Sequence, residues 1–131
     1  MTTLRARTAR PAFLNFARIR FPVGALASIG HRISGMVLVC ALPFAVAVLA
    51  GSLRSEAAFA SSLEAFRSPA GRVGLVVVAW ACAHHLFAGI RHLLMDAGVG
   101  ASLSAGRRSA FAALAAGLAI AGAAASMAVL A

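Results

Sequence analysis

Three long uncharged runs dominate the chain, and arginine interrupts the sequence between them. The runs cover residues 33–53, 73–90 and 109–131, which is 21, 18 and 23 residues. As a helix rising ~1.5 Å per residue, each run with its flanks can cross a hydrocarbon core of ~30 Å. The pattern predicts an all-α membrane protein with three transmembrane helices. The expected helices cover about 23–52, 70–97 and 107–130, within a transmembrane domain of residues 23–131.

The composition supports a membrane protein. Of the 131 residues, 62% are hydrophobic, and the mean hydropathy of +0.93 lies outside the range of soluble globular proteins. The two cysteines, Cys40 and Cys82, lie in separate runs and form no CxxC or His/Cys zinc pattern. We expect both to be small core residues, in neither a disulfide nor a metal site.

The charge distribution predicts the orientation in the membrane. The chain has 12 basic residues, all arginine, and 3 acidic ones, for a net charge of +9. In a soluble protein, such an excess of basic residues would suggest binding to nucleic acid. Here six arginines precede the first run and three separate the second from the third, whereas Glu56 and Glu64 offset the three in the remaining loop. The positive-inside rule therefore predicts a cytoplasmic N-terminus. Because membrane orientation accounts for the arginines, we expect no nucleic-acid partner.

The segments outside the runs carry little chemistry. Residues 1–22 are basic and free of acids, so we expect a cytoplasmic arm at the membrane surface; the same composition is found in organelle transit peptides. A signal peptide is the alternative for the first run, because residues 45–52 resemble a cleavage site, but the basic segment before it is too long. Residues 53–71 are predicted to form a short external loop with a possible helical turn at 56–66.

One polar cluster ends the second run, HHLFAGIRHLLMD at residues 84–96. Ionisable residues are costly at membrane depth and mark functional sites. On a helix, the side chains of His85, Gly89, His92 and Asp96 form one stripe, and those of His84 and Arg91 share another face. Histidine is a common axial ligand of haem iron, and glycine lets a macrocycle approach. The structural alternative is that His85 only bonds a neighbouring helix.

A second polar cluster, SIGHRISG at residues 28–35, precedes the first run. Ser28 and Arg32 are i, i+4 neighbours on one helix face, and His31 and Gly35 are another such pair. A hydroxyl and a guanidinium at the membrane surface can cradle a head group with carbonyl or carboxylate oxygens. The alternative is that Arg32 only anchors the helix by reaching lipid phosphate.

The two clusters resemble the signature stretches of the cytochrome b membrane-anchor subunit of succinate dehydrogenase, respiratory complex II. Arg10-Pro11, the IRFP sequence at residues 19–22 and the three runs also fit, so the resemblance covers nearly the whole chain. The common family variant continues after Arg-Pro with a Ser-Pro-His stretch, where this chain has Ala-Phe-Leu at 12–14. We therefore assign to residues 12–14 none of the contacts that the Ser-Pro-His stretch makes in relatives.

The resemblance implies a function for both clusters. His85 would be an axial ligand of haem b iron, with His31, Arg32 and His92 around the propionates and Ser28 and Arg32 at a ubiquinone. The second iron ligand would come from a second small membrane-anchor subunit, so this chain would form half of a haem-binding heterodimeric helical bundle. Iron-sulfur and flavoprotein subunits would carry the succinate chemistry. The complex would lie in a bacterial inner membrane, surrounded by lipid.

Two other functions remain open. One is a fumarate reductase anchor, running from quinol to fumarate with the same residues. The other is a cofactor-free anchor or small transport subunit, in which the histidines pair structurally. Asp96 can relay protons, although we expect it to be a counter-ion to Arg91 or Arg108. In the third run, small residues at positions 113, 117, 121 and 125 predict tight packing against a neighbouring helix.

Overall fold

The computed structural model describes residues 20–130, which form four helices and no strand. The helices are α1 (Val23–Ser52), α2 (Glu56–Arg67), α3 (Pro69–Asp96) and α4 (Leu103–Leu130). Three of them, α1, α3 and α4, are long and apolar enough to cross a membrane. The all-α class with three spans is therefore confirmed. Residues 1–19 of the expected cytoplasmic arm lie outside the described residues.

Local sequence signals place the helix ends. α1 follows Pro22, and α3 begins with Pro69 in its first turn, where the missing N–H would have had no helical partner. The hydroxyl of Ser68 accepts a hydrogen bond from the Gly71 N–H and caps α3. α4 begins four residues before the expected position 107. Its start lies next to Ser102, whose side chain accepts from the Ala105 N–H.

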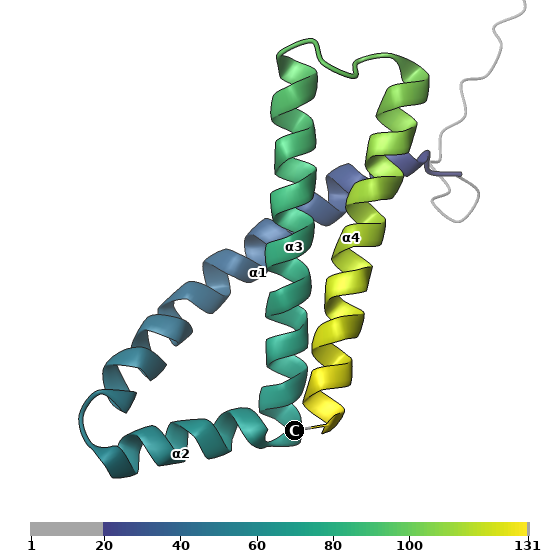
Figure 1. Cartoon of the computed structure of the whole chain (residues 1–131). Coiled ribbons are helices and arrows are strands. Elements are labelled where there is room, and N and C mark those ends of the chain that lie inside the picture. Colours follow the sequence, from purple (N-terminus) through teal and green to yellow (C-terminus); the bar gives the residue numbers. More distant parts are fainter. Residues whose placement is uncertain (1–19, 131) are drawn as a thin grey trace, which may run out of the picture.

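The segment between the first two spans contains a complete helix, α2, where the sequence predicted a short loop with a helical turn at residues 56–66. Ser55 caps it by accepting from the Ala58 N–H, Glu56 lies in its first turn and Arg67 in its last. These charges complement the helix dipole. Figure 1 shows α2 lying across the gap between the end of α1 and the start of α3. At 12 residues it is too short to span, and it bridges two spans instead.

The long helices pack through small residues. α3 and α4 run side by side in opposite directions, while α1 passes them near one end and then diverges (Figure 1). The buried apolar residues are all alanines, at positions 27, 81, 83, 88, 110 and 113. Gly117 is also buried, against His84 of α3, so the predicted tight packing of the third span is confirmed. Small residues allow such close helix approach without a water-driven core.

The outer surface is apolar, as expected for helices in lipid. Large side chains such as Val39, Phe44 and Val129 are 73%, 74% and 81% exposed. Cys40 and Cys82 are exposed as well, so the prediction that they are core residues is wrong for this chain. The faces of α1 and α3 that contact other helices are turned away from both thiols.

Candidate functional site

Three histidines from two helices meet where α1 passes α3. His31 of α1 stacks on His85 of α3 with ring centroids 4.2 Å apart and an interplanar angle of 19°. It also stacks on His92 of α3, at 5.1 Å and 25°. The seven-residue spacing puts both α3 rings on one face. The structure therefore brings together the two polar clusters that the sequence singled out.

The hydrogen bonds of His85 determine which ring nitrogen is free. Its Nδ1 lies 3.1 Å from the backbone carbonyl oxygen of His31 and 3.3 Å from the hydroxyl of Ser34. A carbonyl oxygen only accepts, so Nδ1 carries the proton and donates it. The lone pair is left on Nε2, which is the nitrogen that can bind a metal. This imidazole is in the tautomer that an Nε2-ligating histidine requires.

Ser34 is a site residue that sequence reasoning missed. It is fully buried, and its hydroxyl donates to the His31 carbonyl at 2.9 Å while lying near His85 Nδ1. A serine three residues after a histidine on a helix was the available signal. Its contact with α3 depends on how the two helices are rotated, which periodicity alone does not give.

Two glycines make room for the stacked rings. A Cβ at Gly35 would lie 3.0 Å from Cε1 of His85, and a Cβ at Gly89 would lie 3.4 Å from Nε2 of His31. The sequence predicts that Gly89 admits a macrocycle, whereas in the structure it faces the His31 ring. Each helix thus contributes a glycine opposite the imidazole of the other.

His92 extends the cluster toward the end of α3. Its Nδ1 lies 2.6 Å from the Ala88 carbonyl oxygen, one turn earlier on the same helix. By the same reasoning, Nδ1 donates and Nε2 is free to accept. Among the described residues, no three His, Cys, Asp or Glu side chains are arranged to hold a metal ion.

The structure places Ser28 and Arg32 near the same end of α1. Arg32 is exposed and Ser28 is half-buried. A cavity of about 290 Å³ lies at this end, between the start of α1, the end of α3 and the start of α4. Arg91 and Arg107 line it, whereas neither Ser28 nor Arg32 does. The two residues predicted to bind quinone therefore lie outside the lining of this cavity.

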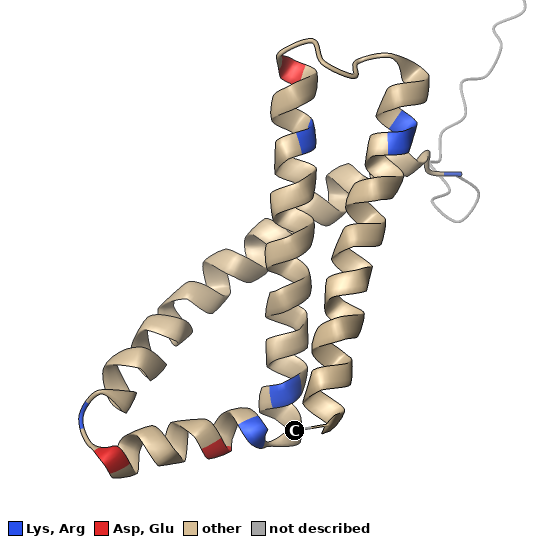
Figure 2. Ribbon diagram, viewed as in Figure 1, with Lys and Arg blue, Asp and Glu red and all other residues tan. Residues whose placement is uncertain are grey.

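Arg91 and Asp96 do not form the predicted pair. The Arg91 guanidinium donates to the Ser109 hydroxyl at 3.1 Å and to the Gly106 carbonyl at 3.3 Å, both on α4. Asp96 is exposed at the end of α3. Of the two partners that the sequence predicts for Asp96, Arg91 and Arg108, the first thus bonds to α4 instead. Figure 2 shows charged residues gathered toward the two ends of the helices, with uncharged ribbon between them.

His84 lies on the other face of α3, as the sequence predicts. It is buried against Gly117 of α4, on the side where Arg91 also contacts α4. Its ring points to α1, where Nε2 lies 3.3 Å from the Ala27 carbonyl oxygen, one turn before His31. Because the ring is enclosed between α1 and α4, His84 is not available as a second ligand to a group that His85 binds.

The fold and the site define a multi-pass helical membrane protein with an oriented histidine cluster between two of its spans. Residues 6–124 match the family described as succinate dehydrogenase/fumarate reductase transmembrane subunit. The chain is 41% identical over 106 residues to the succinate dehydrogenase cytochrome b556 subunit of Coxiella burnetii, covering 78% of this chain and 82% of that protein. It is 35% identical over 100 residues to the subunit of the same name from Paracoccus denitrificans, covering 76% and 77%. The chain belongs to the succinate dehydrogenase/fumarate reductase transmembrane subunit family.

Proposed function

We propose that this chain is the cytochrome b anchor of a succinate:quinone oxidoreductase, in which His85 binds haem b and Ser28 and Arg32 bind ubiquinone. The observation that carries the proposal is the Nδ1–H donation from His85 to the His31 carbonyl, which leaves Nε2 available at membrane depth. A hydrogen bond of this kind orients a ligating imidazole and raises its basicity. The relatives named cytochrome b556 subunits support haem b as the group bound.

The second iron ligand comes from a second small membrane-anchor subunit. His31 stacks face to face on His85, so its ring would lie beside the His85 imidazole and not across a shared metal from it. His84 is enclosed between α1 and α4, so its ring would not reach a haem bound by His85. This chain is therefore half of a haem-binding heterodimeric bundle.

Cationic and polar groups around His85 suit the carboxylate edge of a haem. His31 and His92 lie against the ligand cluster, and Arg32 follows His31 directly on α1. The Arg32 guanidinium, and an imidazole that carries a proton on both nitrogens, would donate charged hydrogen bonds to propionates, and such bonds are strong in a low-dielectric setting. Haem b, when bound, supplies a one-electron redox centre inside the membrane. The chain holds the imidazole and offsets the carboxylate charge.

At the quinone, Ser28 and Arg32 would hydrogen-bond a carbonyl oxygen. Negative charge builds on that oxygen during reduction, and a fixed guanidinium and hydroxyl stabilise it. Electrons come from an iron-sulfur subunit on the cytoplasmic face, and a flavoprotein subunit oxidises succinate. The arginine-rich N-terminal side faces the cytoplasm of a bacterial cell, with the spans in the inner membrane.

The reverse direction is a second candidate, because the matched family includes fumarate reductase subunits. The same His85, Ser28 and Arg32 would then serve quinol oxidation. The names of both relatives favour the succinate dehydrogenase direction.

The direct test is His85→Ala in the intact, partner-containing complex. We expect loss of the reduced-minus-oxidised haem b band, because alanine removes the imidazole that would bind the iron. Cys82→Ala is the matched control, three residues away on α3 and exposed, and should keep the band. A full band in the His85→Ala complex would refute haem ligation by this residue. Absence of any band in the unmutated complex would favour a cofactor-free anchor.

A further inference from the structure

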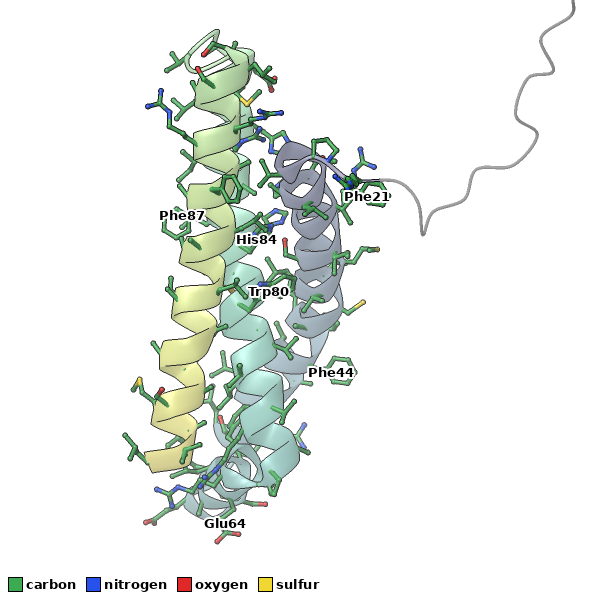
Figure 3. The ribbon with its side chains drawn as sticks, turned by 90° about the vertical axis from the view of Figure 1, so that its right-hand side faces the viewer. Phe21, Phe44, Glu64, Trp80, His84 and Phe87 are labelled. Atoms are coloured by element: carbon green, nitrogen blue, oxygen red, sulfur yellow. The ribbon has the colours of Figure 1, made fainter. Side chains whose placement is uncertain are left out.

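His84 is the largest fully buried side chain of residues 20–130 and lies where three helices meet. It is 1% exposed, and its Nε2 lies 3.3 Å from the Ala27 carbonyl oxygen on α1. Its ring is parallel to that of Trp80, at 5.7 Å and 8°. Figure 3 shows His84 and Trp80 in the interior, between α1 and the pair of α3 and α4.

Glycines on two other helices shape the space that the His84 ring fills. A Cβ at Gly30 of α1 would lie 2.5 Å from Nε2, and a Cβ at Gly117 of α4 would lie 3.0 Å from the His84 Cβ and 3.3 Å from Nδ1. By contrast, a Cβ at Gly51 or Gly122 would meet nothing within 4 Å. The imidazole therefore fills a space that alanine at position 30 or 117 would narrow.

The polar atoms of His84 indicate more than packing. Because the Ala27 carbonyl only accepts, Nε2 carries the proton and Nδ1 has the lone pair. Nδ1 is buried without a hydrogen-bond partner in the part of the chain that the structure describes. A buried, unpaired acceptor opposes folding, so an apolar side chain would serve packing better. What His84 adds is the N–H donated to α1.

Two neighbouring histidines of α3 thus hold two successive turns of α1. His84 donates to the carbonyl of Ala27, and His85 donates to the carbonyl of His31. The first carbonyl belongs to the peptide bond leading into Ser28, and the second to the one leading into Arg32. Since the two rings leave α3 about 100° apart, the paired bonds fix both the rotation and the translation of α1.

We propose that His84 is a positioning residue for quinone reduction, which fixes Ser28 and Arg32 relative to the haem ligand. This inference rests on the proposed function. Removing the donor would let α1 shift against α3 while His85 keeps its own bond to the His31 carbonyl. Displaced Ser28 and Arg32 side chains would make poorer hydrogen bonds to the quinone oxygen, and losing such a bond to a charged group weakens binding by about 10-fold or more. The quinone reaction should therefore be impaired more than haem binding.

The test compares His84→Leu with His84→Gln in the intact complex. In the leucine variant we expect KM for a short-chain ubiquinone to rise roughly 10-fold, with a smaller change in kcat. Haem b content and succinate oxidation by a soluble artificial acceptor should stay normal. Glutamine can donate to the Ala27 carbonyl and should restore most of the quinone KM. A residue that acts only in packing would not show this rescue.

A second pair of variants reaches His84 from α4, a helix without any proposed ligand. Gly117→Ala crowds the imidazole and should also raise the quinone KM, whereas Gly122→Ala should leave it unchanged. An unchanged KM in an assembled leucine or Gly117→Ala complex overturns the proposal, as does a glutamine variant as impaired as leucine. If leucine and Gly117→Ala both prevent assembly while Gly122→Ala assembles, His84 has a packing role and the proposal is also overturned. Failure of the proposed function would appear separately, as a haem band retained in His85→Ala.

Discussion

Gly35→Ala tests whether α1 holds the haem ligand at the geometry seen here. The added Cβ would lie 3.0 Å from Cε1 and 3.4 Å from Nδ1 of His85. Carbon atoms in contact normally lie about 3.5–4.0 Å apart, so the ring or the helix has to move by a few tenths of an ångström. The same ring donates to the His31 carbonyl at 3.1 Å, and a shift away from Gly35 strains that bond.

The magnitude follows from two opposing effects. Alanine replacing glycine inside a helix stabilises it by about 1 kcal/mol, and at Gly51, where the added Cβ meets nothing within 4 Å, this gain should stand alone. At Gly35, overpacking costs about 1–3 kcal/mol and cancels or exceeds the gain. Disturbing the hydrogen bond that orients a ligating histidine typically lowers affinity by about 10–100-fold. Haem affinity should therefore fall in Gly35→Ala alone.

The assay measures haem b per complex from the difference spectrum, before and after competition with a haem-binding scavenger protein. Thermal unfolding in detergent is followed in parallel. Gly51→Ala is the matched control on the same helix and should keep its haem with equal or higher stability. A Gly35→Ala complex that retains haem as firmly as the control would refute the geometry proposed for His85.

Two further predictions concern the polar end of the bundle. Arg32→Ala or Ser28→Ala should lower quinone reduction while leaving succinate oxidation by a soluble artificial acceptor unchanged, and an equal loss of both activities would contradict the quinone assignment. Arg91→Ala should lower the free energy of unfolding in detergent by about 1.5–3 kcal/mol, because its guanidinium donates to α4 at Ser109. Arg108→Ala, which removes an exposed arginine, is the control for that measurement and should have little effect.

The α2 segment was predicted as a loop with a helical turn at residues 56–66, and the structure has a full helix there. α2 has an N-cap at Ser55, an acid in the first turn and a base in the last, all of which are visible in the sequence. Its Phe59 and Leu63 nevertheless remain 58% and 41% exposed. A short helix of this kind is stabilised mainly by its contacts with larger neighbours, and those contacts are not encoded in its own periodicity.

The histidine site was only partly predictable for a related reason. The spacing of His85 and His92 places them on one face of a helix, and this is a property of a single segment. Ser34 as a neighbour of His85, the exposed position of Cys82 and the contact of Arg91 with α4 depend on how separate helices meet. These three features became known only when the helices were placed together.

The sequence by itself determined that three segments cross the membrane, because an uncharged run of sufficient length avoids the high cost of charge in hydrocarbon. It also determined which side chains share a face, since 3.6 residues per turn fix the angles around one axis. Only the tertiary structure decided that His85 donates to the His31 carbonyl and that His84 is buried between Gly30 and Gly117. Helices that pack through small residues can rotate and slide relative to one another, and the register is chosen by the contacts that form between them.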